Sequence, residues 1–196
     1  MKMFPVFLCA MALAGCAAAQ TAEIDPVGEI APLQEDAASP PTKPAPPCQS
    51  AVYHEFDFWI GEWNVYDANG ELAGTNSIQP EEGGCVLVER WQNTGGGTGQ
   101  SYNFYDPGVQ KWRQVWVSKG LVIDYAGGLT DTGSMLLKGE ARYHAGAVAP
   151  FTGEWTLNSD GSVTQHFMQQ ETDTGEWTDW FFGKYVRKAD DPDSAN

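Results

Sequence analysis

The stretch Phe56-Asp57-Phe58-Trp59-Ile60-Gly61-Glu62-Trp63 places four large aromatic side chains within eight residues and ends in a Gly-x-Trp motif. A short helical turn with one dense apolar face can close one end of a β-barrel. Trp63 would then begin the first strand of the barrel wall. The stretch therefore predicts a barrel with a plug at one end.

Turn signals divide the chain after residue 50 into short segments rich in aromatic and β-branched residues. Most of the turn residues accept the positive φ that a hairpin demands. No segment between them shows a long amphipathic helical period. The nine signals are Asn69-Gly70, Gly83-Gly84, Gly95-Gly96-Gly97, Asp106-Pro107-Gly108, Lys119-Gly120, Asp131-Thr132-Gly133, Ala145-Gly146, Asp160-Gly161 and Asp173-Thr174-Gly175.

Nine turns predict about ten strands in one meander. A meander must pair its two edge strands or expose them, and closure into an up-and-down barrel removes both edges. We therefore predict an all-β domain over residues 51–188. It is an antiparallel up-and-down barrel of about ten strands, closed at one end by a short N-terminal helix. A two-sheet sandwich is the alternative.

Alternation along the predicted strands indicates which side chains face the interior. In residues 111–117 the charged residues share a face with the valines, so the opposite face is predicted to be inside. The same argument applies to 135–140 and 151–157. The predicted inward side chains are Trp112, Gln114, Trp116, Met135, Leu137, Phe151, Trp155 and Leu157.

The N-terminus has the pattern of an export signal. Lys2 precedes an apolar run over residues 4–14, which is too short to span a bilayer. The run ends in Leu13-Ala14-Gly15-Cys16, which resembles the lipobox of bacterial lipoproteins. The resemblance implies removal of residues 1–15 and acylation of Cys16. An ordinary signal peptide that removes Cys16 is the alternative. Ala17, by similarity to the sorting rule of enteric bacteria, suggests an outer-membrane anchor facing the periplasm.

Residues 16–50 are rich in Ala, Pro, Glu and Asp and contain few large apolar residues. Such a composition cannot bury a core, so we predict a disordered linker there and a second disordered segment at 189–196. Cys48 and Cys85 remain after the signal and the lipid site are set aside. Two cysteines in an exported domain predict a disulfide, with two free thiols as the alternative.

The net charge of −15 argues against nucleic acid as a partner, because phosphates would be repelled. It also argues against a domain that lies flat on anionic lipid. We therefore expect membrane contact through the lipid anchor only. The sequence indicates no particular protein partner.

Gly61-Glu62-Trp63, with the basic residues Lys184 and Arg187 on the last strand, is similar to the calycin pattern of lipocalins and fatty-acid-binding proteins. In that pattern an Arg or Lys of the final strand covers the Trp at the closed end, which gives Trp63 and Arg187 a structural role. Over residues 48–188 the chain also resembles an uncharacterised bacterial family, catalogued as domain of unknown function 1579. The stretches that carry this resemblance are 56–63, 84–91, 103–107 and 112–117. It implies a lipocalin-like barrel and no established ligand.

The chain is also similar to nitrobindins, ten-stranded barrels that hold haem through a His near the C-terminus. It departs from them twice. Asn64-Val65-Tyr66-Asp67 replaces their glycine-rich run, and residues 177–188 contain no His. His54, His144 and His166 also lack the spacing of a metal site. We therefore predict neither a cofactor nor a metal.

Glu89 shares a strand face with Leu87 and Trp91. If that face is inside, Glu89 is a buried carboxylate that needs partners or a raised pKa. An outward carboxylate paired with a neighbouring Lys or Arg is the alternative. His166 shares a face with Met168, which predicts that the imidazole faces the interior.

Asn103, Tyr105 and Gln114 are uncharged polar residues on faces otherwise suited to packing. They could orient a ligand or form an internal network with ordered water. No Ser-His-Asp set, Cys-His set or Gly-x-Ser-x-Gly motif is present, so we predict no catalytic residue.

The sequence thus predicts an envelope lipoprotein whose barrel binds a small, largely apolar ligand. The predicted contacts are Glu89, Trp91, Asn103, Tyr105, Trp112, Gln114, Trp116, Trp155 and His166. One alternative is a barrel enzyme of isomerase, hydratase or cyclase type that uses Glu89 or His166 as acid or base. Another is a structural or adaptor module of the envelope.

Overall fold

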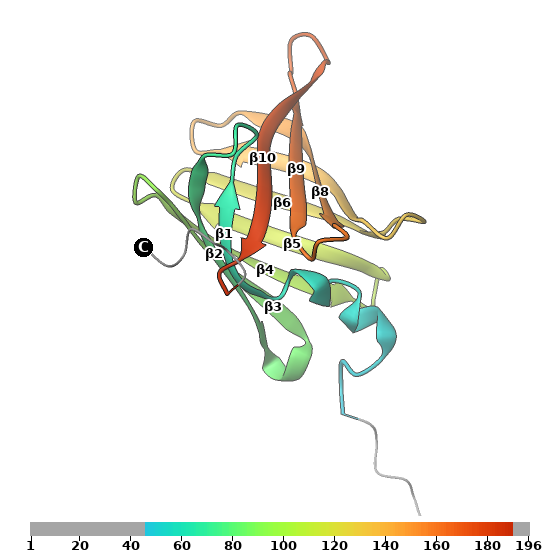
Figure 1. Ribbon diagram of the computed structural model, residues 1–196. Coiled ribbons are helices and arrows are strands. Elements are labelled where there is room, and N and C mark those ends of the chain that lie inside the picture. The colour runs from blue at the N-terminus through green and yellow to red at the C-terminus, as the bar shows by residue number, and fades with distance from the viewer. Residues whose placement is uncertain (1–45, 190–196) are drawn as a thin grey trace, which may run out of the picture. The chain divides into compact units, whose positions relative to one another are not determined.

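The computed structural model describes residues 46–189 (Figure 1). The predicted signal peptide, Cys16, the predicted linker before residue 46 and the predicted tail after residue 189 lie outside the described residues. Within 46–189, no helix is both long enough and apolar enough to cross a membrane.

Ten antiparallel strands form a closed barrel in which each strand pairs with its neighbours along the chain and β1 pairs with β10 (Figure 1). The predicted turn signals fall at the nine connections, so the predicted all-β up-and-down barrel is confirmed and the sandwich is excluded. The strands are β1 (Gly61–Tyr66), β2 (Leu72–Glu81), β3 (Val86–Asn93), β4 (Thr98–Asp106), β5 (Lys111–Ser118), β6 (Leu121–Leu129), β7 (Met135–Tyr143), β8 (Val148–Leu157), β9 (Val163–Gln170) and β10 (Trp177–Arg187).

Two short 3-10 helices, η1 (Ala51–His54) and η2 (Asp57–Trp59), precede β1 and carry the plug. Phe56 and Trp59 are fully buried and stack on each other with ring centroids 5.1 Å apart. Both also contact Trp155 of β8, at 5.2 and 5.5 Å between centroids. These aromatic contacts close one end of the barrel, as the opening stretch of sequence predicts. A third helix, η3 (Glu82–Gly84), forms the turn between β2 and β3.

The Gly-x-Trp motif is explained by the packing of Arg187 on Trp63 beside Gly61. The Arg187 guanidinium lies 4.3 Å from the Trp63 ring centroid, within the range of a cation–π contact, and donates to the Ile60 carbonyl at 3.1 Å. A Cβ on Gly61 would lie 2.5 Å from the Arg187 Nη1, and Gly61 has a φ of +150°. Glycine at position 61 therefore lets the guanidinium cover Trp63.

Along residues 111–117, 135–140 and 151–157 the interior faces follow the predicted alternation. Six of the predicted inward side chains are buried: Trp112, Gln114, Met135, Leu137, Phe151 and Trp155. Trp116 is partly buried and packs on the core. Leu157 lies on the same face as Trp155 and pairs with the buried Val163, but it ends β8 at the rim of the barrel and is 50% exposed.

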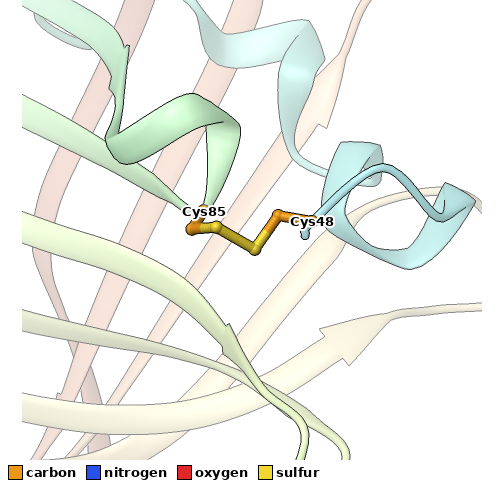
Figure 2. The surroundings of a disulfide bond; sticks show 2 residues. All are labelled: Cys48 and Cys85. Carbon is orange, nitrogen blue, oxygen red and sulfur yellow. A yellow bond between two sulfur atoms is a disulfide. The ribbon is translucent and has the colours of Figure 1, made fainter. Parts of the chain in front are cut away.

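Cys48 and Cys85 form a disulfide with their Cα atoms 5.1 Å apart, which confirms the predicted pairing. Figure 2 shows the bond joining the segment before η1 to the end of the η3 turn. The bridge spans 37 residues of sequence. It therefore ties the plug to the wall of the barrel independently of the aromatic packing.

Removal of this disulfide by the Cys48→Ser/Cys85→Ser double substitution is expected to lower the free energy of unfolding by about 4 kcal/mol. The reason is that the unfolded chain regains the entropy of an open loop. Urea unfolding of the oxidised protein, the reduced protein and the double variant measures the effect. The reduced protein serves as the control and should match the variant, and equal stability of all three would contradict the prediction.

Candidate functional site

A continuous side-chain hydrogen-bond network runs around the inside of the barrel from β6 to β9. It passes through β5, β4, β3, β2 and β10, and it crosses β1 by a direct bond between β2 and β10. None of its members is more than 3% exposed. The members, in order, are Tyr125, Gln114, Asn103, Ser101, Glu89, Asn76, Tyr185 and Gln165.

One arm of the network donates step by step toward Glu89. The Tyr125 hydroxyl donates to Gln114, whose amide donates to Asn103. The Asn103 Nδ2 donates to the Ser101 Oγ at 2.8 Å, and that hydroxyl donates to Glu89 Oε2 at 2.5 Å. Hydrogen bonds aligned in one direction polarise one another, so negative charge is favoured at the accepting end. Glu89 is that end.

The second arm leaves from the other carboxylate oxygen. Asn76 Nδ2 donates to Glu89 Oε1 at 2.7 Å and also to the Tyr185 hydroxyl at 3.2 Å. Tyr185 in turn donates to Gln165 Oε1 at 2.7 Å. Both oxygens of Glu89 therefore accept hydrogen bonds from neutral donors.

Glu89 lies on the interior face, so the predicted inward orientation is confirmed and the outward alternative is wrong. It takes part in none of the ion pairs found among residues 46–189. Burial raises the pKa of Glu89 to about 7, although the hydrogen bonds from Ser101 and Asn76 oppose the shift. Near neutral pH the side chain is therefore present in both protonation states.

A cavity of about 250 Å³ lies beside Glu89, at the end of the barrel opposite the plug. Six of its lining side chains are aromatic, and the network contributes the polar groups of Glu89, Gln165 and Tyr185. The lining residues are Ala73, Glu89, Trp91, Asn93, Trp116, Ile123, Gln165, Phe167, Trp180, Phe181 and Tyr185. An aromatic wall with a few convergent polar groups is the usual composition of a small-molecule site.

A β-bulge in β10 brings two consecutive aromatic residues to this cavity. Asp179 pairs with Met168 and Phe181 pairs with Phe167, so Trp180 is the extra residue between them. Trp180 and Phe181 both line the cavity as a result. The Trp180 indole is held by a hydrogen bond from its Nε1 to the Tyr143 hydroxyl, at 3.2 Å.

Two strand glycines give the tryptophans of the opposite wall their positions. A Cβ on Gly99 would lie 2.1 Å from the Trp116 ring, and a Cβ on Gly74 would lie 2.8 Å from the Trp91 ring. A side chain at position 99 would therefore collide with the Trp116 ring, and one at position 74 would collide with the Trp91 ring and with the backbone of β3. Glycine in a strand interior often marks such a close approach.

Of the predicted contact residues, Glu89, Trp91 and Trp116 line the cavity. Five other predicted contact residues lie away from the cavity, either in the hydrogen-bond network or at the plug end. Asn103 and Gln114 belong to the network but do not line the cavity, which favours the predicted internal network over direct ligand contact. Trp112, Trp155 and Tyr105 pack at the plug end: Trp112 and Trp155 contact Phe56, and Tyr105 contacts Tyr53.

The prediction that His166 faces the interior is wrong. Gln165 and Phe167 are the inward residues of β9, so alternation places His166 and Met168 on the outer face. His166 Nε2 lies 2.8 Å from Asp179 Oδ1 on the outside of β10. The partly apolar character of both faces of β9 hid this orientation in the sequence.

Eight of the eleven lining residues were not predicted: Ala73, Asn93, Ile123, Gln165, Phe167, Trp180, Phe181 and Tyr185. Gln165, Phe167 and Tyr185 obey the strand alternation and could have been found once Glu89 had been placed inside. Trp180 could not, because the bulge breaks the alternation of β10.

The fold and the site together define a plugged, closed antiparallel β-barrel with an aromatic cavity and a buried carboxylate. No protein-family model matches the sequence, and no curated protein matches it significantly. Across residues 46–189 no group of three or more His, Cys, Asp or Glu side chains is placed to hold a metal ion.

The burial of Glu89 predicts a pH-dependent stability. Its pKa is about 7 in the folded protein and about 4.5 in the unfolded chain, so folding favours the protonated form. The stability contributed by Glu89 is complete below pH 4.5 and is lost as the pH rises through 7. Gln cannot ionise. The Glu89→Gln variant should therefore gain about 3 kcal/mol relative to wild type between pH 4 and pH 8. Urea unfolding of both proteins at each pH measures this difference, and a constant difference would contradict it.

Proposed function

We propose that the barrel is a receptor for a small, largely apolar molecule held in the cavity at the end opposite the plug. The observation that carries the proposal is the aromatic lining around a polar group at the inner end of that cavity. Apolar walls supply affinity through burial, and Glu89, Gln165 and Tyr185 supply orientation.

The size of the cavity limits the ligand. Typical ligand pockets have volumes of about 300 to 1,000 Å³, and a dry cavity of about 150 Å³ admits benzene. The volume of about 250 Å³ therefore suits a molecule with one or two small rings rather than a long acyl chain. Trp180 lines the cavity and is 40% exposed, so the cavity reaches the surface of the barrel at this residue.

Filling the cavity is expected to abolish binding. The Ile123→Trp substitution adds an indole to the lining from β6 and should weaken the binding of a neutral two-ring fluorophore, 1-aminonaphthalene, at least tenfold. Val122→Trp is the matched control, because Val122 is the preceding residue and lies on the outer face. Probe fluorescence and tryptophan emission report binding, and thermal melts show that each variant is folded. A wild-type protein that binds no apolar probe would refute the proposal.

A catalytic role is a second candidate, because Glu89 has a pKa near 7 and lines a cavity. A carboxyl group of this kind can take or give a proton in an isomerisation, hydration or cyclisation. Turnover of a bound apolar compound that disappears in Glu89→Gln while binding persists would favour the enzyme over the receptor. His166 drops out of this alternative, because it lies on the outer face.

Kinship with the calycins is part of the proposal. The closed barrel and the contact of Arg187 with Trp63 support it, since the resemblance at Gly61-Glu62-Trp63 implies that contact. Membership of the uncharacterised bacterial family is proposed on the same sequence stretches.

We further propose that the protein is an envelope lipoprotein with its barrel in the periplasm. The support is the lipobox-like Leu13-Ala14-Gly15-Cys16. The Cys48–Cys85 disulfide adds support, because disulfides persist in oxidising compartments. Acylation would bind the chain to a membrane at about 0.8 kcal/mol for each buried methylene.

Metabolic labelling with palmitate tests the anchor. The wild-type chain should incorporate label and sediment with membranes, and the Cys16→Ser variant should do neither. An unlabelled mature protein that retains Cys16 would contradict acylation at this residue.

A further inference from the structure

Within residues 46–189, Glu89 is a buried acid that forms no ion pair, and it lines a cavity. The residue is 3% exposed, and its carboxylate accepts hydrogen bonds from Asn76 and Ser101. No Lys, Arg or His is among the residues that line the cavity. We propose that the ligand of this cavity is a small organic amine, bound as its ammonium ion with Glu89 as the counter-ion. This inference rests on the proposed ligand-binding function.

The direction of the network favours a negative Glu89 in the bound state. From Tyr125 to Ser101 every group donates toward the carboxylate, and Asn76 donates to its other oxygen. These donors stabilise an anion, but neutral donors alone do not compensate a buried charge. A cation that enters the cavity completes the compensation, because two opposite charges attract strongly where water is excluded.

The walls suit a cation as well as an apolar body. Trp91, Trp116 and Trp180 lie around the cavity together with Phe167 and Phe181. The face of an aromatic ring carries partial negative charge and attracts a cation within about 6 Å, most strongly for Trp. The same rings can pack against a hydrocarbon skeleton. One cavity can therefore hold both the ammonium group and the hydrocarbon part of an amine.

The net charge of the chain also favours a cationic ligand. A net charge of −15 raises the local concentration of cations and lowers that of anions. A ligand with a carboxylate would meet this field and then Glu89 itself, with no basic lining group to receive it. Anionic ligands are therefore disfavoured both as they approach the protein and inside the cavity.

Protonation of Glu89 competes with the amine. The groups that face Glu89 from the neighbouring strands are Asn76 on β2, Ser101 on β4 and Tyr185 on β10. Burial raises the pKa of Tyr185, and that of Tyr125 at the end of the network, well above the ordinary value. Glu89 is thus the network group that titrates near neutral pH, where its pKa is about 7. An alkylamine stays protonated there, so its affinity should rise about tenfold from pH 6 to pH 8.

Three ligands with one skeleton and different charges test the proposal: phenethylamine, 2-phenylethanol and phenylacetate. Calorimetric titration of the full-length protein at pH 8 should give the tightest binding for the amine, at least tenfold tighter than for the alcohol, and no detectable binding of the acid. The amine affinity should fall about tenfold at pH 6, while that of the alcohol stays constant. Equal affinities for amine and alcohol, or an amine affinity that falls as the pH rises, would overturn the inference.

Substitution of the carboxylate provides a second, independent measurement. Glu89→Gln should weaken amine binding at least tenfold and remove its pH dependence, and it should weaken alcohol binding by a much smaller factor. Glu140→Gln is the matched control, because it removes the same charge from the outer face of β7, where Glu140 pairs with Arg142. It should leave amine binding unchanged, and equal losses in the two variants would overturn the role of Glu89.

The failure of this inference is distinguishable from the failure of the proposed function. Binding of 2-phenylethanol without preference for the amine would refute the amine and leave the receptor intact. Absence of binding by all three ligands and by the apolar fluorophore would refute the receptor itself.

Discussion

The circumference of a ten-stranded barrel is the constraint on which the rest of this structure depends. Eight strands enclose an interior that side chains just fill, and ten enclose more. The additional interior volume of the ten-stranded barrel is filled differently at its two ends. Phe56 and Trp59 enter from outside the wall as a plug at one end. A chain of hydrogen-bonded polar groups lines the interior from β6 through β3 and β10 to β9, and a cavity of about 250 Å³ lies at the other end. The aromatic content of the chain follows from this geometry.

The polar network links the inner faces of neighbouring strands. Its amides and hydroxyls bridge from one strand to the next. Buried polar groups are tolerated only when they are hydrogen-bonded, and each of these side chains has at least one partner. Closure of the barrel is necessary for the second arm, because the bond from Asn76 to Tyr185 crosses the β1 to β10 seam. The environment of Glu89 is therefore a property of the closed barrel and not of one hairpin.

The sequence predicted the barrel well because its signals are local. Turn glycines, strand alternation and the 56–63 stretch each depend on a few neighbouring residues. The site was predicted only in part, because a cavity depends on which inward residues meet across the barrel. Trp112 and Trp116 look equivalent in sequence, but they lie at opposite ends of β5, and only Trp116 reaches the cavity. Trp180 was missed because the bulge reverses the alternation, and His166 was misplaced because neither face of β9 is clearly polar.

The plug and the cavity are coupled through Tyr125. Its ring contacts Trp155, which packs on the plug, at 6.1 Å between centroids, and contacts Phe167 of the cavity wall at 6.3 Å. Its hydroxyl begins the arm of hydrogen bonds that ends at Glu89. A side chain fixed by aromatic contacts on both sides loses little further freedom when its hydroxyl donates in one direction. Tyr125 thus belongs both to the aromatic packing that continues from the plug through Trp155 and to the hydrogen-bond arm that ends at Glu89. One side chain therefore joins the two halves of the interior, the aromatic half at the plug and the polar half beside the cavity.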